Sequence, residues 1–191
     1  PTGELKFVGT YNSGGGLDGF ASIKAIKANT TSGDGSAYLA FFTNTSTSSL
    51  TEKMRLDSSG NLGLGVTPSG WNTLTTMQIK NASFSGYGNH SYTMANTFYQ
   101  TGWKYIASEY ALQYYQNATS GAHTWFTAPS GTAGNAITFT QAMTLFASGG
   151  LSLGNTNDPS ANNIRLADSA KIGFGDGTSW YSGSGSTVSY T

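Results

Sequence analysis

The sequence has no cysteine, few charges and no long apolar run, and each absence narrows what the protein can be. Without cysteine there is neither a disulfide framework nor thiolate chemistry. No apolar run approaches the roughly 18 residues that a membrane helix needs, so we expect no membrane insertion. Nine basic residues balance nine acidic ones, and only Arg55 and Arg165 are arginine, so no basic stripe is available for nucleic acid.

What the chain does contain is glycine, hydroxyl and amide residues, and aromatics. Charged residues make up 9%, aromatics 13%, and 26 of the 191 residues are glycine. Disordered chains are highly charged and poor in aromatics, so this composition indicates a folded protein that stays soluble through hydroxyls and amides. The chain begins at Pro1 without a methionine, and we therefore expect a fragment or a processed product.

One pattern occurs three times. In the stretch 52–65, EKMRLDSSGNLGLG, two short alternating runs flank a five-residue turn of Asp, Ser, Gly and Asn, which is typical of a β-hairpin. The stretches QAMTLFASGGLSLG (141–154) and NIRLADSAKIGFG (163–175) keep the apolar spacing. In their turns Phe146 replaces Asp57, while Ala170 and Lys171 replace Gly60 and Asn61, so their turn type stays open. The repeated apolar positions are Met54, Leu56, Leu62, Leu64, Met143, Leu145, Leu151, Leu153, Ile164, Leu166, Ile172 and Phe174.

The remaining chain also reads as strands. No segment places apolar residues at helical spacing over more than about two turns, and even the most helix-like run, Ala21–Ala28, partly alternates. The other short runs between turn residues are Glu4–Val8, Ala37–Thr43, Thr76–Ile79, Lys104–Gln116, His123–Thr127 and Ala136–Thr140. We therefore expect an all-β fold.

Prolines divide the chain into three predicted units. Pro68 and Pro159 each follow a copy of the hairpin by a few residues, which gives units 1–67, 68–158 and a truncated 159–191. Units one and two each run from a short opening strand through an aromatic strand to the hairpin. Unit two also contains an aromatic insertion at about 84–115. The third hairpin lies where the other units have their opening strand, so it either starts a unit or ends one.

Such units need partners. Each offers only short strands with two or three apolar residues on a face, and unpaired edges with few charges promote aggregation. Pairing identical chains around an axis removes that hazard, and small residues let three backbones approach. We expect an obligate homotrimer whose shared core is formed by the repeated apolar positions.

The run EKMRLDSSGNLGLGVTP resembles the repeat found upstream of the self-cleaving chaperone domain in bacteriophage tail fibres and tailspikes. The matching residues are Met54, Arg55, Asp57, Ser58, Ser59, Gly60, Asn61, Gly63, Gly65 and Pro68. SGYGNHSYTMANTFYQTGWKYIAS, GAHTWFTAPSGTAGNAITFTQAMTL and IRLADSAKIGFGDG are similar to tail-fibre segments too. The resemblance implies an elongated, intertwined homotrimeric β fibre (a triple β-helix or β-prism-like shaft with a globular β insertion) on the virion, with other tail or fibre proteins as partners.

Catalytic and metal sites have little support. A glycosidase needs two carboxylates about 5–10 Å apart, and most acids here stand beside turn residues. Glu109 alone lies in an aromatic stretch, as an exposed strand acid or as half of a catalytic pair. His90 and His123 are isolated, although three copies of His123 around an axis would form a ring. We predict no catalytic residue, no metal and no cofactor.

The aromatic insertion is the strongest binding candidate. Its aromatic residues alternate with Asn and Gln; aromatic faces stack on sugars and amides bind hydroxyls. The alternative is that these rings form a packed β core. The candidate receptor-binding residues are Tyr87, His90, Tyr92, Tyr99, Trp103 and Tyr105.

Together these features predict a tail-fibre segment that attaches to a host surface glycan or protein through three identical faces. Three alternatives stay open: a purely structural shaft, a polysaccharide-depolymerising tailspike and, on composition alone, a bacterial surface fibre or adhesin.

Overall fold

The computed structural model describes residues 2–45, 49–154, 164–166, 172–174 and 179–181. Every regular element within these ranges is a β-strand, which confirms the all-β prediction. None of these residues forms a helix that could cross a membrane. The run Ala21–Ala28 is strand, as expected from its partial alternation.

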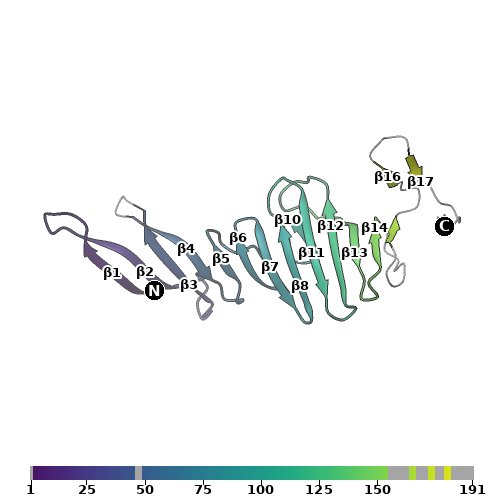
Figure 1. Ribbon diagram of the computed structural model, residues 1–191. Coiled ribbons are helices and arrows are strands. Elements are labelled where there is room, and N and C mark those ends of the chain that lie inside the picture. The colour runs from purple at the N-terminus through teal and green to yellow at the C-terminus, as the bar shows by residue number, and fades with distance from the viewer. Residues whose placement is uncertain (1, 46–48, 155–163, 167–171, 175–178, 182–191) are drawn as a thin grey trace.

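Thirteen strands form one large sheet in which each strand lies beside the next along the chain, apart from one excursion (Figure 1). The excursion is β9 (Thr97–Tyr99) and β10 (Trp103–Tyr105), which pair with each other. A further pair is β16 (Ile172–Phe174) with β17 (Ser179–Tyr181). The sheet order is β1 (Thr2–Thr10), β2 (Leu17–Lys27), β3 (Ala37–Asn44), β4 (Leu50–Leu56), β5 (Leu62–Leu64), β6 (Thr75–Ile79), β7 (Ala82–Tyr87), β8 (His90–Ala95), β11 (Ala111–Asn117), β12 (Ala122–Ala128), β13 (Thr140–Leu145), β14 (Leu151–Leu153) and β15 (Ile164–Leu166).

Two predicted strand runs are corrected. Lys104–Gln116 is not continuous: it divides into β10 and β11, because the chain leaves the sheet and returns. Ala136–Thr140 is mostly irregular, with a single bridge from Ala136 to Lys104, and Thr140 already belongs to β13. Its apolar residues Ile137 and Phe139 pack into a cluster instead of alternating across a ladder.

The hairpins β4–β5 and β13–β14 have matching hydrogen bonds. Met54 pairs with Leu64 as Met143 does with Leu153, and a bulge precedes each pair. In the first turn Gly60 N donates to Asp57 O (3.1 Å), and in the second Gly149 N donates to Phe146 O (2.9 Å). Both glycines have a φ of 84°, which suits only glycine without strain. The Phe146 substitution therefore leaves the backbone of the turn unchanged, although it removes the side-chain hydrogen bonds that Asp57 accepts in the first turn. The third turn lies outside the described residues.

Each of these hairpins is followed by a parallel strand in the same register. Leu62 and Leu64 of β5 pair with Met77 and Ile79 of β6, and Leu151 and Leu153 of β14 pair with Ile164 and Leu166 of β15 in the same way. The segment IRL thus takes the position that MQI takes earlier, as an opening strand would. The boundaries of the three units stay a prediction.

The register assigns strand residues to two faces, since side chains alternate along a strand and paired residues share a face. We call the face with Leu56 and Leu64 the apolar face, and the face with Arg55 and Gln78 the polar face. The buried strand residues of the sheet all lie on the polar face. They include Ser22, Ala40, Thr76, Gln78, Ser83, Ser85, Met94, Ala111, Gln113, Thr124, Ala128, Thr144 and Ser152.

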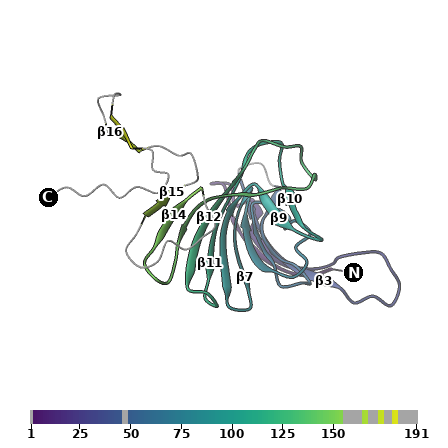
Figure 2. The ribbon, with the colours of Figure 1, turned by 90° about the vertical axis from the view of Figure 1, so that its right-hand side faces the viewer.

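The polar face is covered over its middle part by the excursion and by two loops (Figure 2). Trp71 and Leu74, from the loop before β6, pack against Met94. Tyr105 and Ile137 pack over the sheet residues Ala111 and Ala128. These are the two hydrophobic clusters among the described residues, and both lie between 71 and 139.

Candidate functional site

The apolar face collects most of the residues predicted to form a shared core. Leu56, Leu64, Leu145 and Leu153 are exposed there, by 43%, 44%, 40% and 36% of their surface. Met54, Leu62, Met143 and Leu151 are half-buried on the same face. The register puts Ile164 and Leu166 of β15 in line with this group. Ile172 and Phe174 lie in β16, outside the large sheet.

The exposed apolar residues continue across the whole sheet. Eleven of the seventeen exposed large apolar side chains among the described residues lie on the apolar face. Of the charged strand residues that the register assigns from β1 to β14, Lys27 at the end of β2 and Asp18, opposite Gly9 beyond the bulge, are on this face. Glu4, Lys6, Lys24, Glu52 and Arg55 are on the other face. Besides Leu56, Leu64, Leu145 and Leu153, the exposed apolar side chains on this face are Leu5, Phe7, Leu39, Met77, Ile79, Phe84 and Leu112.

This arrangement inverts the usual one, in which the apolar face of a sheet packs and the polar face meets water. A monomer rarely exposes a contiguous apolar patch of more than a few hundred Å², and larger patches mark interaction sites. The apolar face is therefore the surface of this chain best suited to contact another molecule.

The candidate receptor-binding residues fall into two environments. Tyr87 is 54% exposed at the end of β7. Tyr105 is 5% exposed, and its hydroxyl donates to Pro129 O at 2.7 Å. Trp103 is half-buried and packs against both hydrophobic clusters. Tyr99 contacts Trp103 edge-on, with ring centroids 5.0 Å apart.

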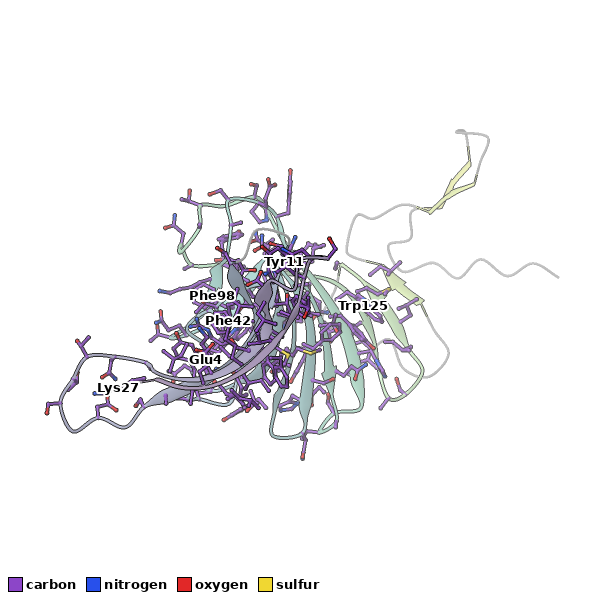
Figure 3. All side chains as sticks on the ribbon, turned by 90° about the vertical axis from the view of Figure 1, so that its left-hand side faces the viewer. Glu4, Tyr11, Lys27, Phe42, Phe98 and Trp125 are labelled. Carbon is purple, nitrogen blue, oxygen red and sulfur yellow. The ribbon has the colours of Figure 1, made fainter. Side chains whose placement is uncertain are left out.

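A row of rings connects His90 to this interior on the polar face. His90 lies 5.5 Å from Tyr115, Tyr115 stacks on Tyr92 at 4.8 Å, and Tyr92 lies 5.7 Å from Trp103, measured between centroids. Burial, together with the neighbouring Tyr115, raises the pKa of Tyr92 to about 12. The structure thus brings His90, Tyr92, Tyr99 and Trp103 into one row. Figure 3 labels Phe98, of the same excursion, on the side of the sheet that carries Phe42 and Glu4.

The remaining candidates are dispersed. Glu109 is exposed in the turn between β10 and β11. His123 is on the apolar face beside Tyr114, whose ring also stacks on Trp125 with centroids 4.8 Å apart. Among the described residues no three His, Asp or Glu side chains gather as a metal site would require.

Two buried side-chain amides, which hold the loop before β6 and the excursion in place, are not predicted from the sequence. Gln78 is fully buried, and its Oε1 accepts from Ser69 N at 2.8 Å and from Trp71 Nε1 at 3.1 Å. Asn96, at a φ of 58°, accepts from Ala107 N at 2.6 Å and donates to three carbonyls on the far side of the excursion. Single amide residues in a chain this rich in Asn, Ser and Thr give no sequence signal of such roles.

Neither a known protein family, nor a curated protein, nor a solved structure matches this chain. The resemblance to phage tail fibres and tailspikes stays a prediction.

Proposed function

We propose that this chain is a segment of a homotrimeric phage tail fibre that lies on the virion and attaches the particle to a host surface glycan or protein. The observation that carries the proposal is the apolar face, which runs from Leu5 to Leu153 with charged side chains only near the ends of β2 and with no cover among the described residues. Covering a leucine or phenylalanine contributes about 1.5–3 kcal/mol. The eleven side chains on this face, which include Met77 and Ile79, are 36–59% exposed, so each adds part of that amount and together they favour association.

Identical chains are the partner that best fits this face. The matched hairpins place the same side-chain pattern at two levels of the sheet, Met54 and Leu64 at one and Met143 and Leu153 at the other. With such a repeat, identical chains can contact one another through equivalent surfaces at both levels, as in an oligomer with closed symmetry. Three copies around an axis would bury the face and leave the polar face, with its aromatic row, outward.

Attachment would then be multivalent. Three weak sites on one trimer gain affinity through effective concentration without any new contact. Tyr87 and His90, at the outer end of the aromatic row, are the accessible predicted binding residues, whereas Tyr105 and Trp103 support the fold beneath them. The burial of Tyr105 favours the second candidate, a purely structural shaft, for the inner part of the insertion.

The experiment compares binding of the labelled chain to a panel of bacterial strains with that of two variants. Leu56→Asp with Leu64→Asp places two negative charges on the apolar face, and Ser58→Asp places a single negative charge in the exposed turn between them. We expect the wild type and Ser58→Asp to bind at least one strain as trimers. The double variant should be monomeric and bind that strain about 100-fold more weakly.

Equal binding by the double variant, or no binding of the wild type to any strain, would contradict the proposal. Cleavage of host polysaccharide by the wild type, read as new reducing ends, would favour the depolymerase alternative instead.

A further inference from the structure

A hollow lies at one end of β8, β11 and β12, where the turns between the strands meet. Its volume is about 380 Å³, within the range of roughly 300–1,000 Å³ that small-molecule sites occupy. Because it is formed at strand ends, covering one face of the sheet does not by itself close it. Its lining is Gly88, Asn89, His90, Ser91, Gln116, Asn117, Ala118, Gly121, Ala122 and His123.

Both histidines of the chain line this hollow, and each is held through one ring nitrogen. His90 Nδ1 hydrogen-bonds the Tyr115 hydroxyl at 3.1 Å, and His123 Nδ1 hydrogen-bonds the Tyr114 hydroxyl. Each imidazole also lies against its tyrosine ring, with centroids 5.5 and 6.0 Å apart. The Nε2 atoms have no hydrogen bond within the described part of the chain, so on each ring this nitrogen is the one left to bond a ligand.

The amide and hydroxyl groups of the lining are also ordered. Ser91 Oγ donates to Gln116 Oε1 at 2.8 Å, and Gln116 Nε2 donates to the Tyr114 hydroxyl at 3.1 Å. Asn117 Oδ1 accepts from Thr119 N at 3.0 Å and from Ser120 N at 3.2 Å, which fixes the turn and leaves its Nδ2 as a donor. Asn89 adds a second side-chain amide from the opposite turn.

The lining contains no Asp, Glu, Lys or Arg. A charged ligand would lose hydration there without an opposite charge to replace it. A neutral ligand with many hydroxyls, by contrast, can both donate to and accept from amides, imidazole and serine. Sugar C–H surfaces would meet the imidazole rings and the small residues Ala118 and Ala122.

We propose that this hollow binds a neutral saccharide unit of one or two sugars. The inference rests on the proposed function, because it names the ligand class and the place of contact for host attachment. Of the receptor-binding residues expected from the sequence, only His90 belongs to this site. The other members come from the β7–β8 and β11–β12 turns and from the adjoining ends of β8, β11 and β12.

The test is saturation-transfer NMR on the full chain with D-glucose, D-galactose, D-mannose, L-rhamnose and N-acetyl-D-glucosamine as separate probes. Ala118→Trp fills the hollow from an exposed turn, and His90→Phe removes one polar edge while keeping a ring. Asn81→Ala is the matched control for Asn89→Ala, since Asn81 is an exposed asparagine in the β6–β7 turn.

At least one sugar should give a signal with the wild type and with Asn81→Ala. That signal should fall at least tenfold in Ala118→Trp and His90→Phe, and more in Asn89→Ala than in its control. No signal from any of the five sugars, or an undiminished signal in Ala118→Trp, would overturn the site. Cell binding that persists in Ala118→Trp overturns this site alone, whereas sugar binding without cell binding overturns the attachment role alone.

Discussion

The N-terminal strands β1–β4 and the covered region, β6–β13 with its excursion, belong to one sheet but are stabilised differently. In the covered region, Trp71, Met94 and Tyr105 form clusters on the polar face. On β1–β4 the same face carries the ion pairs Glu4–Lys24 and Glu52–Arg55, with Arg55 over the Tyr38 ring at 3.9 Å. The β2–β3 hairpin that carries Lys27 projects from the body (Figure 3).

The comparison separates two sources of stability. An uncovered pair of strands is marginal in water and needs packing against a further layer. The covered region carries such a layer within its own chain, whereas β1–β4 have none among the described residues. Both regions leave the apolar face open. The N-terminal strands should therefore depend on neighbouring copies more than the covered region does.

The largest expected effect is in the covered region. Trp103→Ala should destabilise by roughly 3–5 kcal/mol, because the indole packs against both clusters. Phe42→Ala, a matched aromatic truncation on the polar face of β3, should cost only about 1–2 kcal/mol. Denaturant unfolding followed by near-ultraviolet circular dichroism measures both. Equal losses of stability in the two variants would contradict the proposed difference between the covered region and the N-terminal strands.

Asn96→Ala should have the next largest effect and lower the free energy of unfolding by about 2 kcal/mol or more. The change deletes one accepted and three donated hydrogen bonds, and it leaves buried carbonyls without partners. Asn81→Ala is the control, since it removes an exposed asparagine side chain from the neighbouring β6–β7 turn and should cost little. Hydrogen exchange should show loosening confined to β9, β10 and the turn at 106–110. Loosening of β1–β4 to the same extent would contradict the local role.

In the N-terminal region, Glu52→Gln should cost about 0.5–1 kcal/mol, because the ion pair with Arg55 is partly exposed and screened by salt. Gln141 already occupies the matching register position in the β13–β14 hairpin, opposite Phe126 as Glu52 is opposite Phe42. The loss should shrink in 1 M NaCl. A salt-independent loss would mean that the contact acts through packing.

The smallest effect appears only at high pH. Tyr92 has its folded pKa raised to about 12, above the ordinary value near 10, so the folded state holds its proton more tightly. Its contribution to stability is fully present below pH 10 and is lost as the pH rises from about 10 to 12. Tyr92→Phe should flatten the stability curve in that window. An unchanged slope would contradict a shifted Tyr92.

The sequence predicts local elements well, but it says much less about which face of the sheet is packed against other parts of the chain. Alternation and turn residues predicted the Met54–Leu64 and Met143–Leu153 hairpins, because register and turn type depend on neighbours in the chain. Alternation also predicts two faces, but it cannot say which is covered. Here two loops, which contain Trp71 and Ile137, pack on the polar face. The excursion was missed as a separate pair because one buried asparagine, Asn96, holds it.

The candidate site divides in the same way. The repeated apolar positions could be named in advance, and ten of the twelve fall in line on one face. The aromatic residues could be named as a group, but their separation into a packed row and an exposed end depends on the path of β9 and β10. The hollow between two turns depends on strand order, which no local pattern contains.

The central claim is that copies of this chain cover the apolar face. Light scattering on the purified chain at micromolar concentration measures it directly. Three copies of 19.9 kDa predict a particle of about 60 kDa, and a stable particle of about 20 kDa would contradict the claim.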